Sequence, residues 1–454
     1  MTKMRMGIVV TVCSLVVAGG MGRPAGAAAV AGPPPYTGDV LSRTTLTGDW
    51  GGARDTWAKK GVTFDASVTQ ITQGVVDGGK DSHWEYGGRG DLTVNLDSQK
   101  LGLWPGGFLN VELEGNWSDS VNNKTGGLNP ANTSQLFPLV GGNNVALPSL
   151  TAMQFVSHYA GAVVGKLQTL SNSDMNEFAH GKGDAQFCNI AFNINPATLI
   201  VPYSTLAAGA VILPTADPNQ AVITAMVLSA TGKASTDGFD KLHGAIFAGE
   251  GRVRTNFFDR TGHQVLGALY SNKVYTSIDQ RIAFEPLQER LGLAGPQTLE
   301  KKSGSWAMYY NFDQFLYETD KKAGNGVGVF GRFGASAGNP NPTQYFFSIG
   351  FGGKGMIPGR SFDRFGIGYY YDRVANPTLS TKRFGTAEFL RSEWGFEAFY
   401  NIALTQWLLL TPDVQVIGPA QKREITGSVA GPRSALGSSI GMATVLGVRL
   451  QVVL

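Results

Sequence analysis

The sequence predicts an all-β protein, namely a transmembrane antiparallel β-barrel of about 16 strands with a short N-terminal helix. Apolar and polar residues alternate with period two along much of the chain, which is typical of strands. The 454 residues contain 16% charged residues, 10% aromatic residues and 61 glycines. Because soluble chains usually carry about a quarter charged residues, this composition favours strands with one face in lipid and one in water.

The clearest alternation lies in residues 394–417. Its first half places aromatic or apolar residues on one face and glycine, carboxylate or amide groups on the other. Residues 408–417 repeat the pattern with Thr411, Asp413 and Gln415 on the polar side. Successive strand residues point to opposite faces, so each half has one apolar face. This region predicts a hairpin of two strands, as found in soluble sandwiches and in barrels.

The end of the chain alternates over a longer stretch. Between residues 438 and 454 the even positions from Ile440 to Leu454 are apolar or Thr, and Gly441, Gly447, Arg449 and Gln451 stand between them. A closed barrel requires its last strand to pair with its first, so that no strand edge meets lipid. This segment therefore favours a barrel, although an ordinary half-buried strand would show the same alternation.

The N-terminal residues have the pattern of a secretory signal peptide, which we assign to residues 1–27. Basic Lys3 and Arg5 precede an apolar run, and small residues follow it. Its removal also removes Arg23 but no acidic residue, so the formal charge falls from +3 to zero and nothing indicates a nucleic-acid partner. Cys13 leaves with this peptide, and Cys188 then has no partner for an intrachain disulfide.

The mature chain is predicted to contain a leader with a short helix in residues 28–61 and a barrel in residues 62–454. The helix contains Trp57 and ends at Gly61, and it either caps the first strand or narrows the lumen. Three early strands place Asp91, Glu112 and Glu114 on polar faces. Unpartnered charge is very costly in a dry core, so these faces predict a wet interior.

The middle of the chain shows weaker strand patterns, and the C-terminal third shows stronger ones. The weaker candidates are residues 153–160, 162–167, 207–213, 221–229, 245–256 and 263–272. A long loop spans residues 117–150, and residues 277–302 predict a loop with a helical turn. Long and short connections alternate, and in such barrels the long ones face outside and the tight turns face the periplasm.

Four stretches resemble the carbohydrate-selective porins of the OprB type. They are LTGDWGGARDTWAKKGVTF at 46–64, GKLQTLSNSDMNEFAHG at 165–181, the region with GKGMIPGR at 330–374, and FYNIALTQWLLLTPDVQVI at 399–417. The resemblance implies a 16-stranded barrel in the outer membrane of a Gram-negative bacterium that passes sugars. It does not indicate which sugar. The terminal Leu454 departs from the Phe that commonly ends outer-membrane barrels.

Two sequence matches to catalytic or nucleotide-binding motifs lack the structural surroundings that these motifs require, and no metal-binding spacing is present. Gly326, Gly328 and Gly331 fit G-x-G-x-x-G, but they lie inside an alternating strand and no helix follows. The G-x-S-x-G match at Gly437 opens the terminal strand. The five histidines have no metal-ligand spacing, and Ser157 and His158 point to opposite strand faces. We therefore expect no catalytic residue, metal or cofactor, and a protein that is not an enzyme.

Polar residues on the inward faces are candidates for a sugar-selective constriction. Sugars offer hydroxyl groups to charged and amide side chains, and flat apolar faces to aromatic rings. Arg252 and Arg254 are two residues apart and therefore share a strand face. The alternative is a solvated charge ladder that keeps the pore wet without selecting a solute. The candidates are Arg89, Asn110, Glu112, Glu114, Trp117, Lys166, Arg252 and Arg254.

These observations lead to one hypothesis and two alternatives. The hypothesis is passive diffusion of a carbohydrate, a monosaccharide such as glucose, into the periplasm. The alternatives are a general or anion-preferring porin, which clustered arginines would favour, and a plugged barrel with an enzymatic or adhesive role. The expected partners are sugar solutes and outer-membrane lipid. The sequence leaves open the oligomeric state, monomer or homo-oligomer, and whether the loop at 117–150 enters the lumen.

Overall fold

The computed structural model describes residues 36–138, 145–170, 176–236, 238–239, 243–282, 299–321, 324–377, 379–381, 385–387, 390–426 and 435–454. Several predictions lie outside these residues. They are the signal peptide at 1–27, the leader before Tyr36, and the helical turn expected around residues 288–295.

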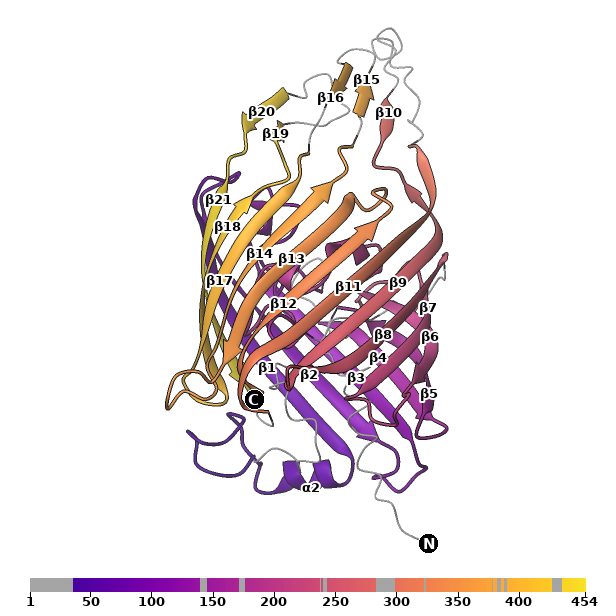
Figure 1. Cartoon of the computed structure of the whole chain (residues 1–454), viewed down its shortest axis with the longest axis vertical. Helices are drawn as coiled ribbons and strands as arrows, with labels where there is room; N and C mark the ends of the chain where they lie inside the picture. Colours follow the sequence, from indigo (N-terminus) through magenta and orange to yellow (C-terminus); the bar gives the residue numbers. More distant parts are fainter. Residues whose placement is uncertain are drawn as a thin grey trace.

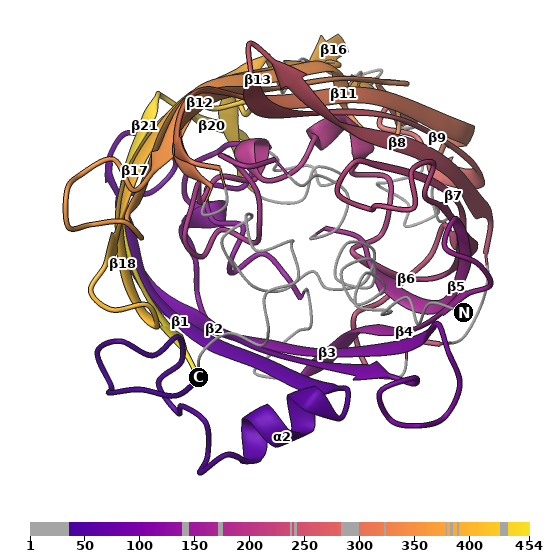
Figure 2. The same cartoon turned by 60° about the horizontal axis from the view of Figure 1, so that its bottom comes forward.

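The described chain forms a closed antiparallel barrel, which confirms the predicted fold class (Figures 1 and 2). Two small sheets lie outside the barrel wall, one of β10 (Gln280–Ile282), β15 (Leu379–Thr381) and β16 (Gly385–Ala387), the other of β19 (Arg423–Thr426) and β20 (Ala435–Ser439). The 16 barrel strands, in order around the wall, are β1 (Val62–Asp77), β2 (Trp84–Asp97), β3 (Gly107–Ser118), β4 (Ala146–Phe155), β5 (Ala160–Gln168), β6 (Ser204–Ile212), β7 (Ala221–Ser229), β8 (Ala245–Phe257), β9 (Arg260–Thr276), β11 (Lys301–Asp320), β12 (Asn325–Ser336), β13 (Thr343–Lys354), β14 (Arg364–Val374), β17 (Glu393–Ala403), β18 (Leu408–Gly418) and β21 (Ala443–Val453).

The barrel closes where β21 pairs with β1. Val452 is opposite Val68, and the N–H of Leu454 donates to the carbonyl of Ala66 at 2.9 Å. Helix α2 (Ala53–Lys59) lies against β1 outside the barrel (Figure 2). From this helix the buried guanidinium of Arg54 donates to the carbonyls of Phe64 (2.8 Å) and Leu454 (3.0 Å). Of the two interpretations of the helix, the structure agrees with a cap, and this cap ties both sides of the seam together.

The outer surface of the barrel is apolar and rich in aromatic residues. On β11 the outward Trp306, Met308 and Tyr310 are exposed, and they alternate with the buried Ala307 and Asn311. This is the pattern expected where strands face lipid. In the described part of the chain, no helix is long and apolar enough to cross a membrane.

The two ends of the barrel differ, as the loop lengths predicted. The shorter turns lie at the end that carries α2, and the longer connections, with β10, β15 and β16, lie at the other (Figure 1). The boundaries of the weak strand predicted at residues 153–160 were wrong. β4 begins at Ala146, seven residues before the predicted start, because Pro148 and Ser149 interrupt the apolar pattern but are tolerated in the strand. Residues 156–159 form the turn to β5.

Two of the long connections fill much of the barrel interior. They are the connection between β3 and β4 and the connection between β5 and β6, which runs inside the wall in Figure 2. We call the described part of the second one, residues 176–203, the inner loop. The fold therefore answers the question that the sequence left open, since residues 119–138 of the long loop contact lumen-facing side chains of β14, β17 and β18.

Candidate functional site: a divided lumen

The inner loop packs against a part of the wall where the inward positions are glycines. A Cβ atom added at Gly328 would lie 2.6 Å from the ring of Phe178, and one added at Gly368 would lie 2.5 Å from the ring of Phe192. Both distances are too short for a real contact. The absence of side chains on β12 and β14 thus creates the space that these phenylalanines fill. The rings join a fully buried aromatic cluster with Phe330.

Polar side chains on neighbouring strands hold the backbone of both inward connections. The carboxylate of Glu397 on β17 accepts hydrogen bonds from the N–H groups of Cys188 and Asn189, the second at 2.8 Å. The carboxylate of Glu393 accepts from the N–H of Asn129 at 3.1 Å. On β21, Arg449 donates to the carbonyl of Gln186 at 2.8 Å. Lumen charges on this side are therefore used to fix the two connections.

A buried charge cluster joins the inner loop to β2 and β3. The ammonium of Lys182 contacts Asp91 at 3.3 Å, and it also contacts Glu112 and Glu114. Arg89 pairs with Asp91 at 2.8 Å and with Glu114. Burial alone would lower the pKa of Lys182, but Glu112 and Glu114 outweigh it and hold that pKa well above its ordinary value. The cluster thus joins a charged loop residue to the wall.

The same three carboxylates approach one another closely enough to hold a metal ion, because oxygen atoms of Asp91, Glu112 and Glu114 lie within 4.8 Å of one another. Hard cations such as Ca²⁺ bind oxygen ligands of this kind. Here the positive charge comes from the protein, since Lys182 and Arg89 contact these oxygens directly. We therefore interpret the cluster as an ion-pair anchor for the inner loop.

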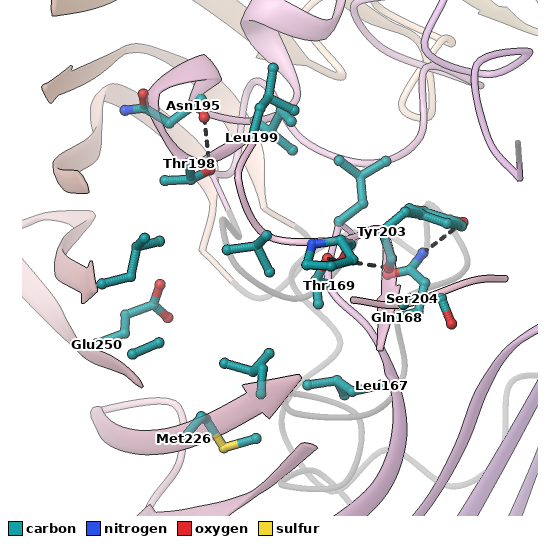
Figure 3. Close-up of a pocket in the computed structure, with 18 of the residues that line it drawn as sticks. Leu167, Gln168, Thr169, Asn195, Thr198, Leu199, Tyr203, Ser204, Met226 and Glu250 are labelled. Carbon is teal, nitrogen blue, oxygen red and sulfur yellow. Dashed lines mark hydrogen bonds between the residues drawn. The ribbon is translucent and has the colours of Figure 1, made fainter. Parts of the chain in front are cut away.

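The open space lies on the other side of the lumen. A cavity of about 730 Å³ is bounded by β5–β9, β11 and the inner loop, together with residues 136–137 and 232–235 of two other connections (Figure 3). The rings of Phe137 and Tyr203 stack at its edge with centroids 4.2 Å apart. The hydroxyl of Tyr203 donates to Glu114 in the charge cluster and accepts from the amide of Gln168 at 3.2 Å. The anchor therefore also positions one wall of the cavity.

Four polar side chains lie on two adjacent levels of the cavity wall. Arg252 is the register partner of Val265, and Val265 is the partner of Asn311. Glu250 and Tyr309 lie one level above, on either side of Gly267, and the Tyr309 hydroxyl donates to Glu250. Asn311 is 1% exposed, and neither atom of its amide has a hydrogen-bond partner among the described residues. We call Glu250, Arg252, Tyr309 and Asn311 the polar belt.

The structure brings some of the predicted site residues together and separates others. Arg89, Glu112 and Glu114 meet in the charge cluster, and Arg252 lines the cavity. Arg254 shares the face of Arg252 but is exposed nearer the β8–β9 turn, where it donates to the Thr261 hydroxyl at 3.1 Å. The prediction that Arg252 and Arg254 share a strand face was thus correct, but the two arginines lie at different depths.

Two further candidates, Asn110 and Lys166, lie away from the cavity. Asn110 bonds to Asn95 at 2.8 Å and to Ser149 at 3.0 Å within the wall. The buried ammonium of Lys166 donates to the carbonyl of Ser235 and lies 5.1 Å from the ring centroid of Phe239. Neither residue is among the described residues that line the cavity.

Trp117 does not occupy the lumen position that the sequence suggested. Strand β3 continues through Trp117, whose ring lies over Gly88 on β2. Gly88 and its neighbour Arg89 occupy opposite faces of the strand, and the side chain of Arg89 points inward to Glu114. Trp117 is therefore on the outer face of the barrel, and we omit it from the proposed sugar site.

Several residues of the cavity and of the charge cluster were not among the candidates. Glu250 has the same strand parity as Arg252, and Asn311 lies on the polar side of an alternating strand, so both carried a usable signal. Lys182, Phe137 and Tyr203 lie in connections without periodicity. Nothing local in the sequence places these three residues beside the barrel wall.

Comparisons with known proteins agree with this architecture. The family model described as "Carbohydrate-selective porin, OprB family" matches residues 82–454. The high-pH structure of Pseudomonas putida OprB is 18% identical and covers 91% of this chain and 99% of that chain, with a TM-score of 0.71. The low-pH structure of the same protein has the same identity and coverage, with a TM-score of 0.54. Among curated proteins, no match was found.

Proposed function

The chain belongs to the OprB family of carbohydrate-selective porins, and on this premise we propose that a monosaccharide such as glucose diffuses through the cavity beside the inner loop. The protein is a sugar porin of the Gram-negative outer membrane. In the proposed route, solute enters at the end with the long connections, passes between β7–β9 and the inner loop, and contacts the polar belt. Flux depends on width and hydrogen bonding, and no reaction takes place.

The observation that carries this proposal is the polar belt. Buried amides in folded proteins nearly always have hydrogen-bond partners, and the Asn311 amide can offer two N–H donors and one carbonyl acceptor to sugar hydroxyls. Arg252 adds charged donors and Glu250 adds acceptors. Because the cation of Arg252 and the anion of Glu250 lie only two residues apart on one face of β8, their net field is small, which suits a neutral solute. The Tyr203 ring at the cavity edge offers an apolar surface to a sugar face.

The test compares two arginines that share a strand face. The purified protein is placed in a planar bilayer, and block of single-channel current by glucose is measured for the wild type, Arg252→Ala and Arg254→Ala. We expect Arg252→Ala to weaken the block about tenfold, because a hydrogen bond to a charged group contributes roughly 1.5–3 kcal/mol. Arg254→Ala is the matched control and should change the block little, since Arg254 lies outside the cavity lining.

Two results would contradict the proposal. Equal weakening in both variants would mean that the arginines act through general charge rather than at one depth of the cavity. Steady wild-type current at high glucose concentration would mean that the belt does not bind this sugar.

A further inference from the structure

One part of the lumen wall is apolar where a porin interior is usually polar. In the half of the barrel nearer the long connections, Met226 on β7 pairs with Ala248 on β8, and Ala248 pairs with Leu269 on β9. One level higher, Leu228 pairs with Ile246. These side chains point inward and pack together in one cluster. We call Met226, Leu228, Ala248 and Leu269 the apolar band.

The apolar band faces the cavity, and Ile200 and Val201 of the inner loop pack against part of the same cluster. All four of its residues line the 730 Å³ cavity (Figure 3 labels Met226). The other side of the cavity carries apolar side chains as well, from the two inward connections. These are Leu136, Ile194, Leu199 and Val201. Water in this part of the cavity therefore meets apolar surface on two sides, and its displacement by an apolar group is favourable.

The polar belt begins directly below the apolar band. Thr224 on β7 is opposite Glu250, two residues along each strand from the pair Met226 and Ala248. Two residues along a strand correspond to about 6.6 Å. The cavity is thus amphipathic along the route. Its apolar level and its polar level are close enough for one sugar ring and one substituent to contact both. A plain monosaccharide can satisfy only the polar level.

We propose that the preferred solutes are glycosides with a small apolar aglycone, of which aryl glycosides are the simplest. In this arrangement the sugar hydroxyls bond to the polar belt while the aromatic ring lies between the apolar band and Leu199. The inference rests on the proposed sugar passage through this cavity and specifies the solute class further. The observation that supports the inference is the strand register, which places Met226 and Leu269 one level above Glu250.

The test uses three neutral solutes in the same bilayer recording. They are phenyl β-D-glucoside, glucose, and cellobiose, which has a second sugar in place of the phenyl group. We expect phenyl glucoside to block the current at about tenfold lower concentration than glucose, the ratio given by removing roughly 50–60 Å² of apolar surface from water. Cellobiose should show no such gain, because its second ring adds mainly hydroxyl groups.

Two variants connect this preference to the apolar band. The double variant Met226→Gln/Leu269→Asn keeps side-chain size but adds polar groups, and it should reduce the tenfold ratio to about one while glucose block changes less than twofold. If it fails to assemble, Leu269→Ala removes apolar area without adding a polar group and should still lower the ratio. The control is Val445→Thr, which alters a buried residue outside the cavity lining.

The outcomes separate this inference from the proposed function. Glucose block without a preference for phenyl glucoside would overturn the inference and leave the sugar route intact. A preference that persists in both band variants would also overturn it, because the ring would then bind elsewhere. Absence of block by all three solutes would remove both the inference and the proposed route.

Discussion

Replacement of Lys182 by Met is expected to loosen the inner loop, raise single-channel conductance and destabilise the barrel. The ammonium of Lys182 contacts Asp91, Glu112 and Glu114, all largely buried. Removing it leaves three carboxylates near one guanidinium, that of Arg89. Breaking a buried ion pair by removing one partner typically costs about 3–5 kcal/mol. Thermal unfolding of the purified protein and single-channel recording would measure the two effects.

The matched control is Lys124→Met. Lys124 also contacts a carboxylate, Asp81 at 2.8 Å, but the pair is exposed to solvent. Exposed ion pairs contribute little to stability, so we expect the unfolding temperature and the conductance of this variant to stay close to the wild-type values. If the Lys182→Met protein had the same unfolding temperature and the same conductance as the Lys124→Met protein, the charge cluster would not be the anchor of the inner loop.

Replacement of Gly368 by Leu is expected to displace the inner loop from the opposite side. The nearest atom to an added Cβ is in the ring of Phe192, at 2.5 Å, and the strand that carries Gly368 is paired on both sides. Because the wall cannot retreat easily, the ring must move. Overpacking of a filled interior costs about 1–3 kcal/mol. We expect a larger conductance and weaker discrimination between sugars of different size, both measurable by bilayer recording and liposome swelling.

Gly251→Leu provides the control for the second prediction. Gly251 also lies in the middle of a barrel strand, but an added Cβ there meets nothing within 4 Å. The side chain would extend from the outer face, where leucine suits a lipid environment. Wild-type conductance is therefore expected. A Gly368→Leu protein with unchanged conductance and sugar discrimination would show that the inner loop tolerates the added volume and does not set the width of the route.

Much of the barrel wall could be predicted because alternation is a local property of the strand backbone. Parity alone places Arg89, Glu112 and Glu114 on inward faces, and it also places Trp117 on the outer face with Leu113. The misassignment of Trp117 came from ending the strand too early. The weak signal of β6 has a physical cause, since inward Ala207 and Val211 and outward Ala208 and Ile212 are all apolar.

The sequence by itself determined the barrel, its approximate strand number and the side of the wall on which each strong-strand residue lies. Only the tertiary structure decided what occupies the lumen. The backbone N–H of Cys188 donates to the carboxylate of Glu397, which is 209 residues away, and the ammonium of Lys182 contacts Glu112 across 70 residues. Strand parity follows from adjacent residues, whereas these contacts depend on how two connections without periodicity pack inside a closed wall. The position and the amphipathic character of the sugar route follow from that packing.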